Sequence, residues 1–184
     1  MRLEDCKDDI VRVVISEEQI KERIAQMGAE ISKDYAGEPL LVVGVLRGAV
    51  MVVADVVREI SIPLHIDWMA VSSYGASTKS SGVVRILKDL NTDITGINVL
   101  IVEDIIDTGL TLDYLKQNLE ARGPKSVKIA TFLRKPDASE VDVPVDYIGF
   151  DIPNEFVVGY GLDYAEDYRH LTFIGTLSPH VYVG

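Results

Sequence analysis

The sequence predicts an α/β fold, a mostly parallel, twisted sheet with helices on both faces. Two wholly apolar runs, at residues 40–46 and 99–102, have the length and β-branching typical of strands buried on both faces of such a sheet. Each run is followed by a turn and then by apolar residues at helical spacing. The 184 residues suit one domain with a sizeable core. We therefore expect ligands to bind at the carboxyl ends of the strands.

The N-terminal region predicts a short strand or extended lead-in at residues 10–15 and then a helix over roughly 17–35. Ser16 and Gln19 have the spacing of a capping box at the start of this helix. Its core face consists of apolar residues at helical spacing, namely Ile20, Ile24, Met27 and Ile31. We expect this helix to serve packing alone.

The strand at 40–46 ends at Arg47-Gly48, and a helix is expected over 49–60. A turn between a buried strand and a helix favours anions, because the helix N-terminus offers unpaired N–H groups. A further strand is expected at 63–73. The Ser- and Gly-rich residues 72–82 cannot build a core and predict a mobile loop, with a returning strand at 83–90.

The segment 98–119 contains the clearest chemical signal. Its apolar run is followed by two carboxylates, Glu103 and Asp104, where a strand should end in a turn. A turn of Thr, Gly and Thr then leads into a helix, which makes an anion site. The carboxylates suit sugar hydroxyls or Mg²⁺. Together these features predict a phosphorylated sugar as ligand.

Later residues predict strands at 126–133, 147–152 and 156–158. Two familiar nucleotide motifs are missing from the sequence: there is no P-loop, and Gly159-Tyr160-Gly161 lacks the third glycine of a dinucleotide fold. Kinase and dehydrogenase functions therefore have little support.

Composition excludes other classes of protein. The formal net charge of −11 argues against a general nucleic-acid or anionic-membrane surface. Cys6 is the one cysteine, so no intrachain disulfide is expected, and the acidic N-terminal stretch is no signal peptide. No apolar run is long enough to span a membrane. We expect a soluble cytoplasmic protein with neither nucleic acid nor membrane as partner.

Residues 102–109 with Thr111 resemble the phosphoribosyl pyrophosphate signature of type I phosphoribosyltransferases, in the form of the motif that is typical of the hypoxanthine-guanine branch. The resemblance covers roughly residues 10–175. It implies the type I phosphoribosyltransferase fold, with 1–184 as a single domain. The core would lie at about 37–150, with a small hood formed by about 1–15 and 151–184.

The resemblance implies roles for individual residues. Asp107 would be catalytic, close to the purine N7. The phosphoribosyl pyrophosphate site would comprise Leu46, Arg47, Gly48, Glu103, Asp104, Ile105, Ile106, Asp107, Thr108, Gly109, Leu110, Thr111 and Arg169. Mg²⁺ would be held by Glu103, Asp104 and Asp163. The purine would meet Lys135, Phe156, Val157 and Asp163. Ser73 and Tyr74 match the Ser-Tyr pair of a lid over the reactants.

The implied reaction transfers 5-phosphoribose from phosphoribosyl pyrophosphate to N9 of hypoxanthine or guanine, in a homodimer or homotetramer. Two alternatives stay open. One is a regulator of the same fold that senses phosphoribosyl pyrophosphate and binds RNA or a protein. The other is a transferase that prefers xanthine or adenine.

Overall fold

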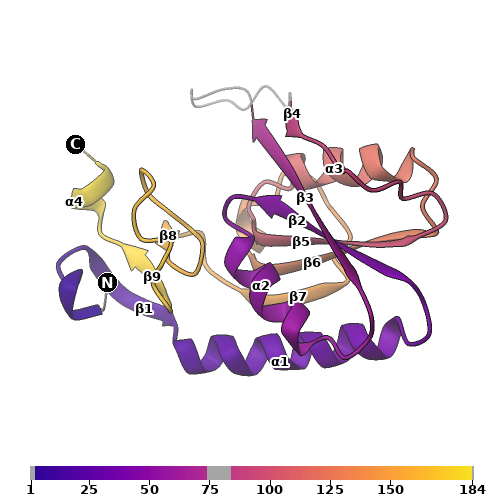
Figure 1. The fold of residues 1–184 in the computed structure, drawn as a ribbon. Helices are drawn as coiled ribbons and strands as arrows, with labels where there is room; N and C mark the ends of the chain where they lie inside the picture. Colours follow the sequence, from indigo (N-terminus) through magenta and orange to yellow (C-terminus); the bar gives the residue numbers. More distant parts are fainter. Residues whose placement is uncertain (1–2, 74–83, 184) are drawn as a thin grey trace.

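The computed structural model describes residues 3–73 and 84–183, and its main body is a six-stranded sheet (Figure 1). The strand order is β4-β3-β2-β5-β6-β7, parallel throughout except for the antiparallel edge strand β4. The strands are β2 (Leu40–Leu46), β3 (His65–Ser73), β4 (Val84–Lys88), β5 (Asn98–Ile106), β6 (Ser126–Arg134) and β7 (Tyr147–Asp151). The predicted mostly parallel sheet is confirmed.

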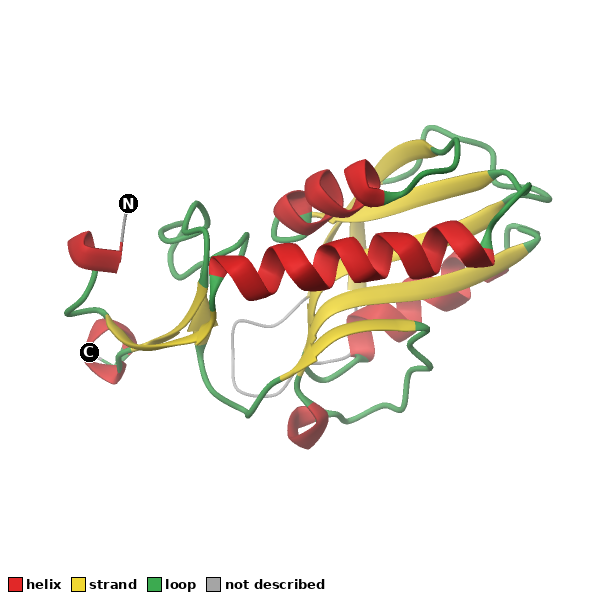
Figure 2. Cartoon of the chain, turned by 90° about the horizontal axis from the view of Figure 1, so that it is seen from below, coloured by secondary structure: helices red, strands yellow, loops and turns green. Residues whose placement is uncertain are grey.

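Helices cover both faces of this sheet. Helices α1 (Glu17–Asp34) and α2 (Val50–Glu59) pack into one apolar core, and Figure 2 shows α1 running across the sheet. Helix α3 (Leu110–Glu120) packs into a second core on the other face. Burial of both strand faces explains why β2 and the first half of β5 are continuously apolar.

A smaller antiparallel sheet stands beside the carboxyl ends of the large one (Figure 1). Its strands are β1 (Ile10–Ile15), β9 (Ile174–Leu177) and β8 (Val157–Val158), in the order β1-β9-β8. Three short helices complete the described chain: η1 (Leu3–Asp5), η2 (Pro136–Ala138) and α4 (Pro179–Tyr182). Both terminal regions therefore build the hood, as the sequence predicts, and α1 belongs with the large sheet.

The capping box at the start of α1 is confirmed. Ser16 Oγ accepts a hydrogen bond from the Gln19 N–H (3.3 Å), and the Gln19 side-chain oxygen accepts one from the Ser16 N–H (2.9 Å). Within residues 3–73 and 84–183, no helix is both long and apolar enough to cross a membrane.

The expectation that the strand ends before the acidic pair is wrong. Strand β5 continues to Ile106, so Glu103 and Asp104 are strand residues. The pairing with β6 runs on past the apolar segment, with Glu103 opposite Thr131 and Ile105 opposite Leu133. Backbone pairing with a nine-residue neighbour thus outweighs the polar character of the side chains.

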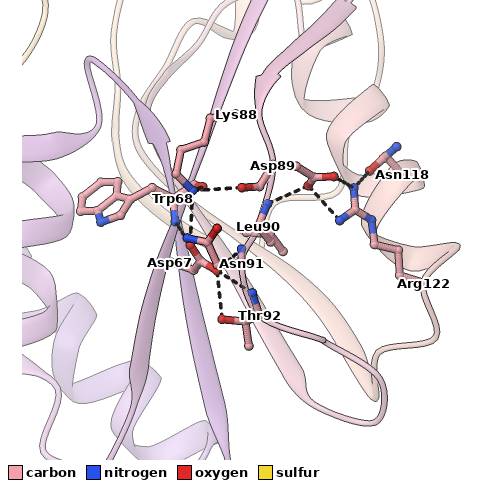
Figure 3. Close-up of polar contacts among 9 residues, drawn as sticks. All are labelled: Asp67, Trp68, Lys88, Asp89, Leu90, Asn91, Thr92, Asn118 and Arg122. Carbon is pink, nitrogen blue, oxygen red and sulfur yellow. Dashed lines mark hydrogen bonds and ion pairs between the residues drawn. The ribbon is translucent and has the colours of Figure 1, made fainter.

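A buried aspartate fastens the segment after β4 to β3 (Figure 3). Asp67 is 5% exposed and accepts hydrogen bonds from the N–H groups of Trp68 (2.8 Å), Asn91 (2.8 Å) and Thr92 (3.0 Å), and from the Thr92 hydroxyl (2.9 Å). The Lys88 Nζ lies 3.6 Å away. Burial by itself raises the pKa of Asp67, but these hydrogen bonds outweigh it and hold the pKa below 3.8.

Replacing Asp67 by alanine should lower the free energy of unfolding by about 2–4 kcal/mol, because three backbone N–H groups lose a shared buried acceptor. An acid whose pKa is lowered on folding stabilises the protein only while it is ionised. The difference in the free energy of unfolding between wild type and variant should therefore stay constant around neutral pH. It should shrink as the pH falls below 3.8. Urea unfolding across this range measures it. The control is Asp93→Ala, whose carboxylate is exposed in the same segment, and an equal loss in both variants would contradict the argument.

Candidate active site

The turn between β5 and α3, the cradle, is where the sequence predicts that a phosphate binds. Gly109, with φ 85°, is the residue before the helix and provides no side-chain cap. The Thr108 carbonyl accepts hydrogen bonds from the N–H groups of Glu140 (3.0 Å) and Val141 (3.1 Å), which brace the turn from behind. A Cβ on Gly109 would stand 2.9 Å from the Val141 carbonyl oxygen. Both the positive φ and this close approach require glycine.

A cavity of about 130 Å³ opens beside this turn. Its walls are Glu103, Ile105, Ile106, Asp107, Thr108, Gly109, Thr111 and Leu112. Seven of these eight residues belong to the predicted phosphoribosyl pyrophosphate site. The structure therefore gathers one carboxylate of the acidic pair, the threonine hydroxyls and the start of α3 around one small space, which suits a sugar phosphate.

Burial disfavours the ionised form of both carboxylates of the acidic pair, Glu103 and Asp104. Burial, reinforced by the charge of Asp104, raises the pKa of Glu103 well above its ordinary value. Burial also raises the pKa of Asp104 to about 6, although the Ile105 N–H (2.8 Å) and the nearby Arg169 oppose this. Two desolvated carboxylates side by side favour a ligand that brings hydrogen-bond donors or a cation.

The turn after β2 packs directly on this pair. The Leu46–Arg47 peptide is cis. A Cβ on Gly48 would collide with the Asp104 carboxylate, so only glycine lets the loop lie against the acid. The Arg47-Gly48 turn and the carboxylate of Asp104 are therefore in direct contact.

Arg169 lies in the hood and is linked to the Arg47-Gly48 turn through Glu166. Its guanidinium donates to the Gly161 carbonyl (2.8 Å) and pairs with Asp163 (2.9 Å) and Glu166 (3.2 Å). Glu166 also pairs with Arg47 (3.0 Å), whose side chain is 71% exposed. Arg47 and Arg169, both predicted site residues, thus share an ion pair with Glu166, which the sequence did not point to.

Asp107 and Lys135 meet at the ends of the adjacent strands β5 and β6. The Lys135 Nζ lies 3.8 Å from an Asp107 carboxylate oxygen. The lysine side chain is only 10% exposed, whereas that of Asp107 is 55% exposed. Both line a cavity of about 230 Å³. A buried donor and an open acceptor side by side suit a flat heterocycle with a carbonyl and a ring N–H.

The predicted purine contacts on the hood do not line that cavity. Phe156 stacks on Tyr182 (ring centroids 4.9 Å apart) and meets the Tyr164 ring at its edge (5.9 Å). Val157 is buried in the core that α1 and α2 share. Tyr182 escaped the sequence analysis because a lone tyrosine near a chain end has no periodic pattern.

Of the two residues predicted to belong to a lid, Ser73 and Tyr74, the structure describes only the first. Ser73 is the last residue of β3, and Tyr74 lies outside the described residues. Among residues 3–73 and 84–183, no three His, Cys, Asp or Glu side chains lie close enough together to hold a metal ion. Mg²⁺ commonly uses only one or two carboxylates together with water and substrate phosphates, so the donors present remain compatible with it.

The parallel sheet, the cradle after β5 and the hood define a type I phosphoribosyltransferase, and the family model "Phosphoribosyl transferase domain" matches residues 15–165. The hypoxanthine-guanine phosphoribosyltransferase of Mycobacterium tuberculosis is 56% identical over 180 residues, covering 95% of this chain and 89% of that protein. The one from Bacillus subtilis is 51% identical over 176 residues, covering 96% and 98%. A crystal structure of a hypoxanthine phosphoribosyltransferase from Staphylococcus aureus superposes with a TM-score of 0.94 at 46% identity, covering 97% of each chain. The chain belongs to the hypoxanthine-guanine phosphoribosyltransferase family, enzymes of purine salvage.

Proposed function

We propose that this enzyme transfers 5-phosphoribose from phosphoribosyl pyrophosphate to N9 of hypoxanthine or guanine, releasing pyrophosphate and forming the 5′-mononucleotide. The observation that supports this most directly is the 3.8 Å approach of Lys135 to Asp107 beside the phosphate cradle. A lysine can only donate hydrogen bonds, so it suits the 6-oxygen of these bases and penalises the amino group of adenine.

On the phosphoribosyl side, Glu103 and Asp104 would accept hydrogen bonds from the ribose hydroxyls. The 5′-phosphate would lie at the turn formed by Thr108, Gly109, Leu110 and Thr111, against the N-terminus of α3. The pyrophosphate would contact the backbone of the Leu46-Arg47-Gly48 turn and the Arg169 side chain, and Ile105 and Ile106 would complete the site. The ribose gains positive charge as the C1–O bond breaks, and the acidic pair would stabilise that charge.

Mg²⁺ is the cofactor we propose: Glu103 and Asp104 would hold it together with substrate oxygens, and Asp163 would reach it only through bound water. When bound, it neutralises charge on the departing pyrophosphate. The raised pKa values of the acidic pair support this, because a nearby cation would offset the burial that disfavours both ionised carboxylates.

On the purine side, Asp107 would accept the N7 proton or a hydrogen bond from it. Lys135 would contact the 6-oxygen, Phe156 would stack on the base, and Val157 would offer backbone groups to its edge. Asp163 would hold water molecules bound to Mg²⁺. Ser73 and Tyr74 would take part in closing the site over the reactants.

We further propose that residues 1–184 form one phosphoribosyltransferase domain, that it works in the cytoplasm and that it assembles as a homodimer or homotetramer. Light scattering at several protein concentrations tests the assembly.

Initial rates with phosphoribosyl pyrophosphate and Mg²⁺ against hypoxanthine, guanine, xanthine and adenine test the reaction. We expect turnover with the first two bases and none with adenine. Turnover with xanthine alone would indicate the xanthine-preferring transferase. Binding of phosphoribosyl pyrophosphate without turnover of any base, together with retention of RNA at moderate salt, would indicate the regulator.

Replacing Lys135 by alanine should raise the KM for hypoxanthine roughly 10- to 100-fold, because a charged hydrogen bond to the 6-oxygen is lost. The preference for hypoxanthine over adenine should fall at the same time. Steady-state kinetics with both bases measures this. Lys125→Ala is the control, since that lysine is exposed and paired with Glu38. Unchanged base selectivity in the Lys135 variant would mean that the lysine only balances Asp107.

A further inference from the structure

Tyr160 lies in the hood turn in an unusual backbone conformation. Its φ is 50°, and both neighbours, Gly159 and Gly161, have φ 101°. Three consecutive residues in the left-handed region make a tight turn that a non-glycine residue adopts only at a cost. The side chain of Tyr160 is nevertheless buried, with 8% of the residue exposed. The burial of a tyrosine in such a turn indicates that its side chain anchors the turn.

The anchor is helix α2. The Tyr160 hydroxyl donates a 2.7 Å hydrogen bond to Asp55, and its ring packs against Phe132 of β6 (centroids 5.1 Å apart). Asp55 also pairs with Arg58 on the same helix. Helix α2 begins at Val50, directly after the Arg47-Gly48 turn. One rigid helix therefore carries both the loop against the acidic pair and the acceptor for Tyr160.

The same hood turn holds Arg169. The Tyr160 N–H donates to the Leu171 carbonyl (3.0 Å), and the Gly161 N–H donates to the Arg169 carbonyl (2.9 Å). The Gly161 carbonyl in turn accepts from the Arg169 guanidinium (2.8 Å). The Cα of Gly161 packs so closely on the Gly48 carbonyl oxygen that a Cβ there would collide with it. The turn thus touches both groups proposed to meet the pyrophosphate.

We propose that Tyr160 and Asp55 are positioning residues for the pyrophosphate: their hydrogen bond fixes the hood turn so that Arg169 and the Arg47-Gly48 loop keep the spacing that the pyrophosphate requires. This rests on the proposed function, in which Arg169 and that loop contact the pyrophosphate. Neither Tyr160 nor Asp55 needs to touch a substrate. Loss of the bond lets the turn shift against α2, and small displacements of this kind cost binding strongly.

The structure offers a matched control in Tyr147. Its hydroxyl donates a 2.7 Å hydrogen bond to Asp34, and it is 4% exposed, but it ties α1 to β7 in the core between α1 and the sheet. Tyr160→Phe and Tyr147→Phe each remove one buried hydroxyl from one aspartate. If Tyr160 had a purely structural role, the two variants would have the same Kd for pyrophosphate.

Calorimetric titration with inorganic pyrophosphate in the presence of Mg²⁺ tests the proposal on the full chain. Tyr160→Phe should raise the Kd for pyrophosphate and the KM for phosphoribosyl pyrophosphate roughly 5- to 20-fold, with less than about a twofold change in the KM for hypoxanthine. Tyr147→Phe should lower the Tm without changing the Kd. Asp55→Asn keeps an acceptor oxygen and should bind within about twofold of wild type, whereas Asp55→Ala should reproduce Tyr160→Phe. Equal Kd values for the two tyrosine variants would overturn the proposal.

Arg169→Gln separates this inference from the proposed function. If that variant weakens pyrophosphate binding and Tyr160→Phe does not, the positioning role is wrong and the site assignment stands. If Arg169→Gln binds pyrophosphate as wild type does, the assignment of Arg169 is wrong, and the positioning role is wrong with it.

Discussion

Replacing Asp107 by asparagine should lower kcat by roughly 10- to 1000-fold, the range typical of groups that transfer a proton in the transition state. Asparagine has nearly the same shape but cannot accept the N7 proton. The side chain is 55% exposed at the open end of its cavity, so the Tm should change little. Steady-state kinetics with hypoxanthine together with a thermal unfolding scan measures both quantities.

The matched control for this prediction is Asp142→Asn. Asp142 lines the same cavity, is exposed and has no proposed role. Its replacement removes the same charge from the same region without removing the proton acceptor. Equal kcat values for the two variants would show that Asp107 contributes only general electrostatics. An unchanged kcat in the Asp107 variant would remove its catalytic role altogether.

The order of elements was predictable from sequence because apolar runs of seven and four residues, rich in β-branched side chains and bounded by turns, are typical of strands buried on both faces of a sheet. The cradle was predictable for a related reason. Phosphate binding by backbone needs a glycine turn at a helix start, and such a turn is contiguous in sequence, as residues 108–111 are. Local signals of this kind lie within a few residues of the feature that they specify.

The features that sequence missed depend on contacts between distant segments. Strand β5 extends through Glu103 and Asp104 because β6 offers a partner for its backbone there, and no local pattern reports the length of a neighbouring strand. Glu166 bridges Arg47 and Arg169 across more than a hundred residues of chain. Strand β9 exists only through its pairing with β1 and β8. The Gly159 and Gly161 pair was a visible turn signal, but nothing in sequence said that the turn would lie on Gly48.

Replacing Asp104 by asparagine should stabilise the ligand-free protein while weakening its binding of phosphoribosyl pyrophosphate. Burial raises the pKa of Asp104 to about 6, so keeping it ionised at pH 8 costs the folded state about 2–3 kcal/mol, most of which asparagine would recover. Asparagine can still accept the hydrogen bond from the Ile105 N–H. Because it is neutral and has one acceptor fewer, the KM for phosphoribosyl pyrophosphate should rise at least about 10-fold.

The pH dependence of the stability difference identifies its cause. An acid whose pKa is raised on folding binds its proton more tightly in the folded state, so the wild type regains stability as the pH falls. The higher free energy of unfolding of the Asp104→Asn variant should be fully present above pH 6. It should vanish by pH 3.8, the ordinary pKa of Asp. Urea unfolding between these limits measures it, with exposed Asp142→Asn as the control that should show no such trend. A pH-independent advantage would instead point to better packing against Gly48, and a loss of stability at pH 8 would mean that Arg169 already balances the charge.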